Sequence, residues 1–64
     1  MKPLHLTRAQ HDALMEFDLD TLKLLFGCYN SQWSISGVTF HNVPDTLYPH
    51  FRGRVNDAME GIES

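Results

Sequence analysis

Four histidines are the first candidates for catalysis or metal binding, because histidine is the residue type that titrates near neutral pH. They are scattered along the chain as His5, His11, His41 and His50. A zinc site needs three or four converging ligands, which usually include close pairs such as Cys-x-x-Cys or His-x-x-x-His, and the sequence contains no such pair. We therefore expect no metal site.

Cys28 is the candidate for a catalytic nucleophile, with a histidine as its base. Its neighbours Phe26 and Tyr29 favour a buried structural thiol, and no charged residue is placed to activate it. A chain of 64 residues leaves little room for both a core and a pocket of roughly 300 Å³ or more. The four glycines are not clustered, as a phosphate-binding loop requires. We expect no catalytic residue, no cofactor and no enzyme activity.

Length and composition predict a single small domain that spans residues 1–64. Hydrophobic residues make up 42% of the chain and charged residues 20%, with no low-complexity tract, which is typical of a folded protein. A domain this short buries only about 60% of the surface that its unfolded chain exposes, so self-association would stabilise it. A homodimer is the expected oligomeric state.

The charge balance indicates which class of partner to expect. Eight acidic and five basic residues give a net charge of −3, so there is no general attraction to nucleic acid or to anionic lipid. The expected partner is another protein, and neither a nucleic acid nor a membrane. The chain has no secretory apolar segment and no run of about 20 apolar residues for a membrane span. We therefore expect a cytoplasmic protein.

The first half of the chain predicts helical structure. Thr7 and Gln10 have the spacing of a capping box, so a helix is expected to begin at Arg8. One helix continued to Tyr29 would be apolar on nearly all sides in its second half. Asp18 or Asp20 can instead cap a second helix, whose best apolar stripe is Leu22, Leu25, Phe26 and Tyr29. Two helices are preferred, and a single bent helix over 8–29 is the alternative.

A β-hairpin is predicted at about 32–41, because apolar residues alternate on both sides of Ser36-Gly37. If this dipeptide forms the turn, Ile35 pairs with Val38 and Trp33 pairs with Phe40, and all four share one face. Nothing in the hairpin is charged, so its edges are open to pairing with another strand. Leu4–Leu6 either folds back as a third strand or leaves both edges free.

Pro49 helps to locate the last helix, which we expect at about 47–61. With Thr46 as the N-cap, Pro49 falls in the first turn, where its missing N–H costs nothing. Gly61 is a candidate C-terminal stop. Gly53 weakens the helix by about 1 kcal/mol relative to alanine, and it is either neutral drift or a point where another backbone approaches closely. The predicted fold is a small α+β domain whose helices pack on the apolar face of the hairpin.

The apolar residues favour protein binding as the function. The chain has many large apolar side chains for its length, among them four Phe, two Tyr, one Trp and three Met. Aromatic residues, Met and Arg are enriched at the centres of protein interfaces. The candidate partner-binding residues are Trp33, Phe40, Tyr29, Tyr48, Arg52 and Met59. We predict a non-catalytic module that modulates or inhibits a larger protein, by analogy with compact acidic accessory proteins of phages, plasmids and bacteria.

A winged-helix-like nucleic-acid binder is the alternative function. The expected order of helix, helix, hairpin and helix resembles a helix-turn-helix followed by a wing. Its basic contacts would be Lys23, Arg52 and Arg54. The predicted second helix offers only Lys23, and the hairpin tip has no Lys or Arg. The acidic charge of the whole domain therefore favours protein binding.

Overall fold

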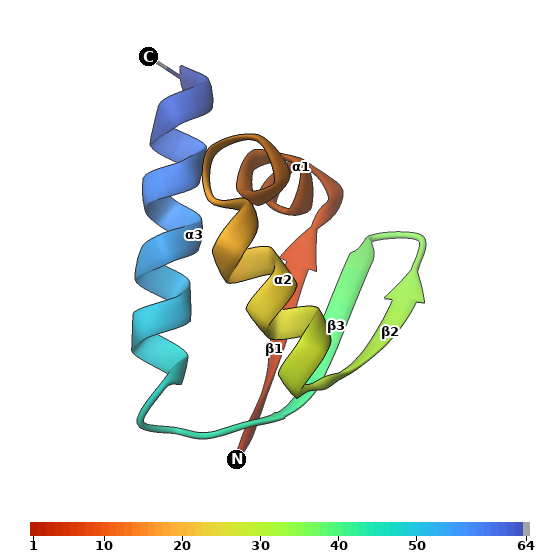
Figure 1. Ribbon diagram of the computed structural model, residues 1–64. Coiled ribbons are helices and arrows are strands. Elements are labelled where there is room, and N and C mark those ends of the chain that lie inside the picture. Colours follow the sequence, from red (N-terminus) through yellow and green to blue (C-terminus); the bar gives the residue numbers. More distant parts are fainter. Residues whose placement is uncertain (64) are drawn as a thin grey trace.

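The computed structural model describes residues 1–63 and shows a small α+β domain, which confirms the predicted fold class (Figure 1). In chain order its elements are β1 (Lys2–Thr7), α1 (Arg8–Phe17), α2 (Leu19–Cys28), β2 (Asn30–Ser34), β3 (Gly37–Val43) and α3 (Tyr48–Glu63). The three strands form one antiparallel sheet in the order β1-β3-β2. The chain therefore places β3 in the centre and leaves β1 and β2 at the two edges.

The helices cover one face of this sheet, and the core lies between them. Leu4, Leu6, Val38 and Phe40 alternate along β1 and β3 onto the covered face, and all four are fully buried. Buried side chains from α1, α2 and α3 complete the core, among them Leu14, Leu25 and Phe51. The opposite face of the sheet is polar and partly exposed.

Leu4–Leu6 forms part of a third strand, which settles the alternative that the sequence left open. Leu4 pairs with Phe40 and Leu6 pairs with Val38. These apolar side chains can be buried on the same face because directly opposed residues of an antiparallel pair point to the same side. β1 thus covers one edge of the β2–β3 hairpin, and the other edge belongs to β2.

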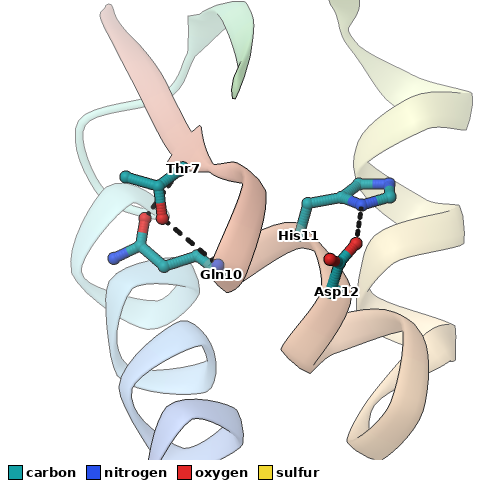
Figure 2. Close-up of polar contacts among 4 residues, drawn as sticks. All are labelled: Thr7, Gln10, His11 and Asp12. Atoms are coloured by element: carbon teal, nitrogen blue, oxygen red, sulfur yellow. Dashed lines mark hydrogen bonds and ion pairs between the residues drawn. The ribbon is translucent and has the colours of Figure 1, made fainter. Parts of the chain in front are cut away.

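Residues 8–29 form two helices, as preferred. The predicted capping box is present: the Gln10 N–H donates to Thr7 Oγ1 over 3.2 Å, and the Thr7 N–H donates to Gln10 Oε1 over 2.9 Å (Figure 2). Asp18 separates the helices, and its carboxylate accepts hydrogen bonds from the Thr21 N–H and the Thr21 hydroxyl. A side chain that satisfies free amides at a helix start stabilises a new helix there, so the chain turns at Asp18.

The hairpin differs from its predicted register by two residues. Ser34 pairs with Gly37 and Trp33 with Val38, so the turn is Ile35-Ser36 and not Ser36-Gly37. The expected Ile35–Val38 and Trp33–Phe40 pairs were therefore wrong. A shift of two residues keeps Trp33 on the predicted face, but it moves Ile35 into the turn, where it is 97% exposed.

Gly37 provides the physical reason for this register. Its φ is +146°, a conformation that side chains rarely allow, and a Cβ there would overlap the carbonyl oxygen of Leu6. Gly37 pairs with Thr7 of β1 as well as with Ser34 of β2. The glycine is therefore needed inside the sheet, where three strands meet, and the turn forms before it.

α3 begins at Tyr48, and Pro49 lies in its first turn as predicted. The N–H groups of Leu47 and Tyr48 both donate to the carbonyl oxygen of Pro44. The expected stop at Gly61 was wrong, because the helix continues to Glu63. At Gly61 an added Cβ would lie 3.2 Å from the ring of Phe17, so the absence of a side chain lets α1 and α3 pack closely.

Gly53 supports a first prediction, since a Cβ at this position would meet nothing within 4 Å. We expect Gly53→Ala to raise the free energy of unfolding by about 0.5–1 kcal/mol, because alanine has the higher helix propensity. Urea denaturation followed by circular dichroism measures this change. A loss of stability would show that another backbone does approach Gly53.

Candidate protein-interaction site

Three aromatic rings from three different elements meet at the surface beside β2. We call His11 of α1, Phe26 of α2 and Trp33 of β2 the aromatic cluster. The ring centroids of His11 and Trp33 lie 5.1 Å apart, and those of Phe26 and Trp33 lie 6.2 Å apart in a stacked arrangement. The ring of Phe40 packs edge-on below Phe26 at 4.9 Å. The cluster is therefore anchored on the core.

The aromatic cluster leaves much of its apolar surface in contact with solvent. Trp33 is 50% exposed and Phe26 is 37% exposed. Trp33 lies opposite Val38 on the helix-covered face, but β2 is the last strand of the sheet, so no further strand covers the outer side of the indole. Large aromatic side chains contribute strongly to binding when a partner removes them from water.

His11 is held in the cluster by a polar contact. Its Nδ1 lies 3.1 Å from Oδ1 of Asp12, which is itself exposed (Figure 2). The His11 side chain is only 13% exposed, because its ring also packs edge-on against Phe26 and Trp33. Asp12 thus orients the imidazole, and the imidazole supports the two apolar rings.

The outer edge of β2 presents unpaired backbone groups next to this cluster. A two-residue turn is closed by a hydrogen-bonded pair, which here is Ser34 with Gly37. Hydrogen-bonded and non-hydrogen-bonded pairs alternate along an antiparallel ladder, so the N–H and C=O groups of Ser31 and Trp33 point away from β3. β2 has no charged residue and no proline, the residues that commonly protect an edge strand.

The edge of β1 is protected by contrast. Pro3 has no N–H to offer to another strand. The carbonyl oxygen of His5 accepts a hydrogen bond from Nη1 of Arg52 over 3.5 Å, and the N–H of Thr7 donates to Gln10. Within residues 1–63, β2 therefore offers the strand edge that is open to a partner.

The structure distributes the predicted partner-binding residues over several surfaces. Trp33 belongs to the aromatic cluster, and Phe40 is fully buried beneath it. The ring of Tyr29 packs against Phe51 with centroids 6.0 Å apart, and it is half-buried. Tyr29 directly precedes β2 in the sequence, and Trp33 of the cluster follows it by four residues.

The other three predicted residues are on α3 and have intramolecular partners. Lys2 Nζ lies 5.2 Å above the ring of Tyr48, and Arg52 contacts the backbone of His5. Met59 packs against the core. The structure therefore does not bring Tyr48, Arg52 and Met59 to the aromatic cluster.

His11 and Phe26 were not among the predicted site residues. Phe26 was assigned to the apolar stripe of its helix, and periodicity could not show that its ring reaches the edge of the sheet. His11 was considered only for catalysis or metal binding, and spacing could not link it to this site, because His11 and Trp33 are 22 positions apart in the chain. Only the packing of α1 and α2 against β2 creates the cluster.

Cys28 is exposed, so the expectation that it is buried was wrong. The buried residues of α2 are Thr21, Leu22 and Leu25, which lie on one side of the helix. Leu24 is 50% exposed, so the edge of α2 that it shares with Cys28 faces solvent. Among the described residues, no element covers this edge, because α2 packs on one side only.

The remaining histidines and acids do not converge in the described part of the chain. His5 Nδ1 lies 2.9 Å from Thr39 Oγ1 and His41 Nε2 lies 3.3 Å from Gln32 Oε1, both on the polar face of the sheet. Among the side chains that the structure describes, no three of His, Cys, Asp or Glu are grouped to hold a metal ion, and no pocket is present in the described part of the chain.

Two of the three basic residues considered for nucleic-acid contacts are engaged within the domain. Arg54 Nε lies 3.4 Å from Oδ2 of Asp18, the residue that caps α2. Arg52 contacts the backbone of His5. Lys23 is exposed on α2. A nucleic acid would have to compete with these contacts for Arg52 and Arg54.

Comparisons with known proteins assign no family to this chain. No protein-family model matches it, and no curated protein or solved structure is significantly similar to it. Within residues 1–63, no helix is both long enough and apolar enough to cross a membrane. Functional interpretation therefore depends on the chemistry of the aromatic cluster and of the β2 edge.

Proposed function

We propose that the protein is a cytoplasmic, non-catalytic protein-binding module that modulates or inhibits a larger partner protein. The observation that carries the proposal is the pair of stacked, half-exposed rings of Trp33 and Phe26 beside the open edge of β2. Exposed aromatic residues next to unpaired backbone groups combine apolar contact with directional hydrogen bonds. Both features suit recognition of another protein.

An extended segment of the partner is the expected binding element. Added to β2, it would form backbone hydrogen bonds with Ser31 and Trp33, whose N–H and C=O groups point outward. One of its apolar side chains would cover the exposed sides of Trp33 and Phe26. Since β2 carries no charge, the affinity is expected to depend only weakly on ionic strength.

Nucleic-acid binding is the second candidate, because two successive helices followed by a hairpin have the order of a winged helix. The charge distribution argues against it. The turn residues Ile35 and Ser36 are uncharged, and Arg54 is paired with Asp18. A nucleic-acid complex would weaken steeply with added salt, whereas the proposed protein complex would not.

Trp33→Ala is the variant that tests the proposal. We expect it to weaken binding to the partner about thirtyfold or more, as truncation of a central interface tryptophan commonly does. Wild-type and variant proteins are used as baits, and the affinity of each for the captured partner is then measured by titration calorimetry. Circular dichroism verifies that the variant is folded.

Ile62→Ala is the matched control, because Ile62 is 48% exposed but lies on α3. The proposal predicts that this variant binds like the wild type. Equal affinities of the Trp33→Ala variant and the wild type would contradict it. So would tight, salt-sensitive binding of DNA or RNA with no protein partner.

A further inference from the structure

We propose that a second copy of this chain can occupy the open edge of β2, so that two sheets join across a two-fold axis. The inference names a partner for the same surface and therefore rests on the proposed function. In this dimer, β2 pairs antiparallel with β2 of the second copy. The joined sheet would have the strand order β1-β3-β2-β2-β3-β1.

The backbone of β2 determines the register of this pairing. Ser31 and Trp33 are the residues of the strand whose N–H and C=O groups point outward. If these groups form hydrogen bonds across a two-fold axis, Ser31 pairs with Trp33 of the second copy. By symmetry, Trp33 pairs with Ser31 of the second copy. Gln32 then lies on the axis opposite its own counterpart, in a non-hydrogen-bonded pair. The strand is therefore complementary to itself.

This register also gives the exposed apolar side chains a partner. Trp33 would face the small Ser31 of the second copy, and the two tryptophans would be diagonal neighbours whose Cα atoms are about 7–8 Å apart. Trp33 is 50% exposed in the single chain. Dimerisation would remove part of its exposed surface from water.

Charge and area are consistent with a weak dimer. The net charge of −3 makes two copies repel each other, but the segment from Asn30 to Val43 carries no Asp, Glu, Lys or Arg, so repulsion at the contact is small. A standard interface buries about 800 Å² per subunit, roughly a fifth of the 4119 Å² surface of this chain. Aromatic side chains bury about 150–250 Å² each when they are fully covered, so the exposed fractions of Trp33 and Phe26, 50% and 37%, supply only part of this area. The expected dissociation constant is in the micromolar range.

Cross-linking by cysteine tests the register directly. In a Cys28→Ser background, Gln32→Cys places two thiols in a non-hydrogen-bonded pair with Cα atoms about 4.5 Å apart, which a disulfide can bridge. Ser34→Cys is the control, because its two copies would be about 13 Å apart along the strands. We expect mild oxidation to give a covalent dimer at least tenfold faster for the Gln32→Cys variant. Equal rates, or faster cross-linking at Ser34, would overturn the register.

The mass of the cysteine-free Cys28→Ser protein in solution is the second measurement. Sedimentation equilibrium over a range on the order of 1 µM to 1 mM should show dimers whose dissociation constant rises about tenfold or more with Trp33→Ala. A monomer throughout this range would overturn the second copy as partner. The proposed function would remain, provided that a larger protein still binds through Trp33. Conversely, a confirmed dimer without any Trp33-dependent partner would refute the proposed function alone.

Discussion

Gly37→Ala is expected to lower the free energy of unfolding by about 3 kcal/mol, the sum of backbone strain and steric overlap. Gly37 has a φ of +146°, and an added Cβ would overlap the carbonyl oxygen of Leu6 and lie 2.9 Å from Thr7 Cα. Both neighbours are backbone atoms of β1, so they cannot move aside without breaking the sheet. A domain of this size has only about 3–5 kcal/mol of stability from its core. The variant should therefore be only marginally stable at room temperature, with about 0–2 kcal/mol left.

Urea denaturation monitored by tryptophan fluorescence tests this result, since Trp33 is the single tryptophan and pairs with Val38 next to Gly37. Gly53→Ala is the matched control, because the same substitution there meets open space. The two glycines should give effects of opposite sign. A Gly37→Ala variant as stable as the wild type would mean that Gly37 is not held against β1.

Phe40→Ala is expected to cost about 3–5 kcal/mol, the usual range for truncating a buried phenylalanine. Phe40 is fully buried in the central strand, where it pairs with Leu4 on one side and Ser31 on the other. Its ring supports Phe26 at 4.9 Å, so its loss should also loosen the aromatic cluster. We therefore expect stability and partner binding to fall together.

Phe40→Leu provides the control, since it keeps most of the apolar volume and should lose clearly less stability than the alanine variant. Thermal unfolding followed by circular dichroism ranks the two variants. If Phe40 instead contacted a partner directly, the Phe40→Ala variant would bind the partner more weakly while its free energy of unfolding stayed the same. That outcome would show that the ring leaves the core in the complex.

Local chemistry made the approximate helix starts predictable from the residues alone, with Asp18 and Asp20 both open as the cap of the second helix. Thr7 and Gln10 satisfy each other's backbone N–H groups, and Asp18 accepts hydrogen bonds from Thr21 at the start of α2. Pro49 could be placed in the first turn of α3 because it has no N–H to donate. Each of these contacts or constraints involves residues at most three positions apart. Such short-range interactions can be read from spacing.

The alternation of the strands was partly predictable for the same reason. Trp33, Val38 and Phe40 were expected on the apolar face, and the register places them there. The face depends only on whether positions are odd or even within each strand, but the pairing depends on where the turn forms. Spacing alone could not show that Gly37 is needed beside Leu6, because the two residues are 31 positions apart in the chain.

The candidate site was decided almost entirely by the tertiary structure. Trp33 was identified from its type, but His11 and Phe26 join it only when α1 and α2 pack beside β2. Likewise, β1 pairs with β3 and so determines which strand edge remains open. By itself the sequence determined the helix starts, the presence of a hairpin and the apolar face, all of which arise from neighbouring residues. The register, the aromatic cluster and the open edge of β2 required the tertiary structure, because close packing joins residues that are distant in the chain.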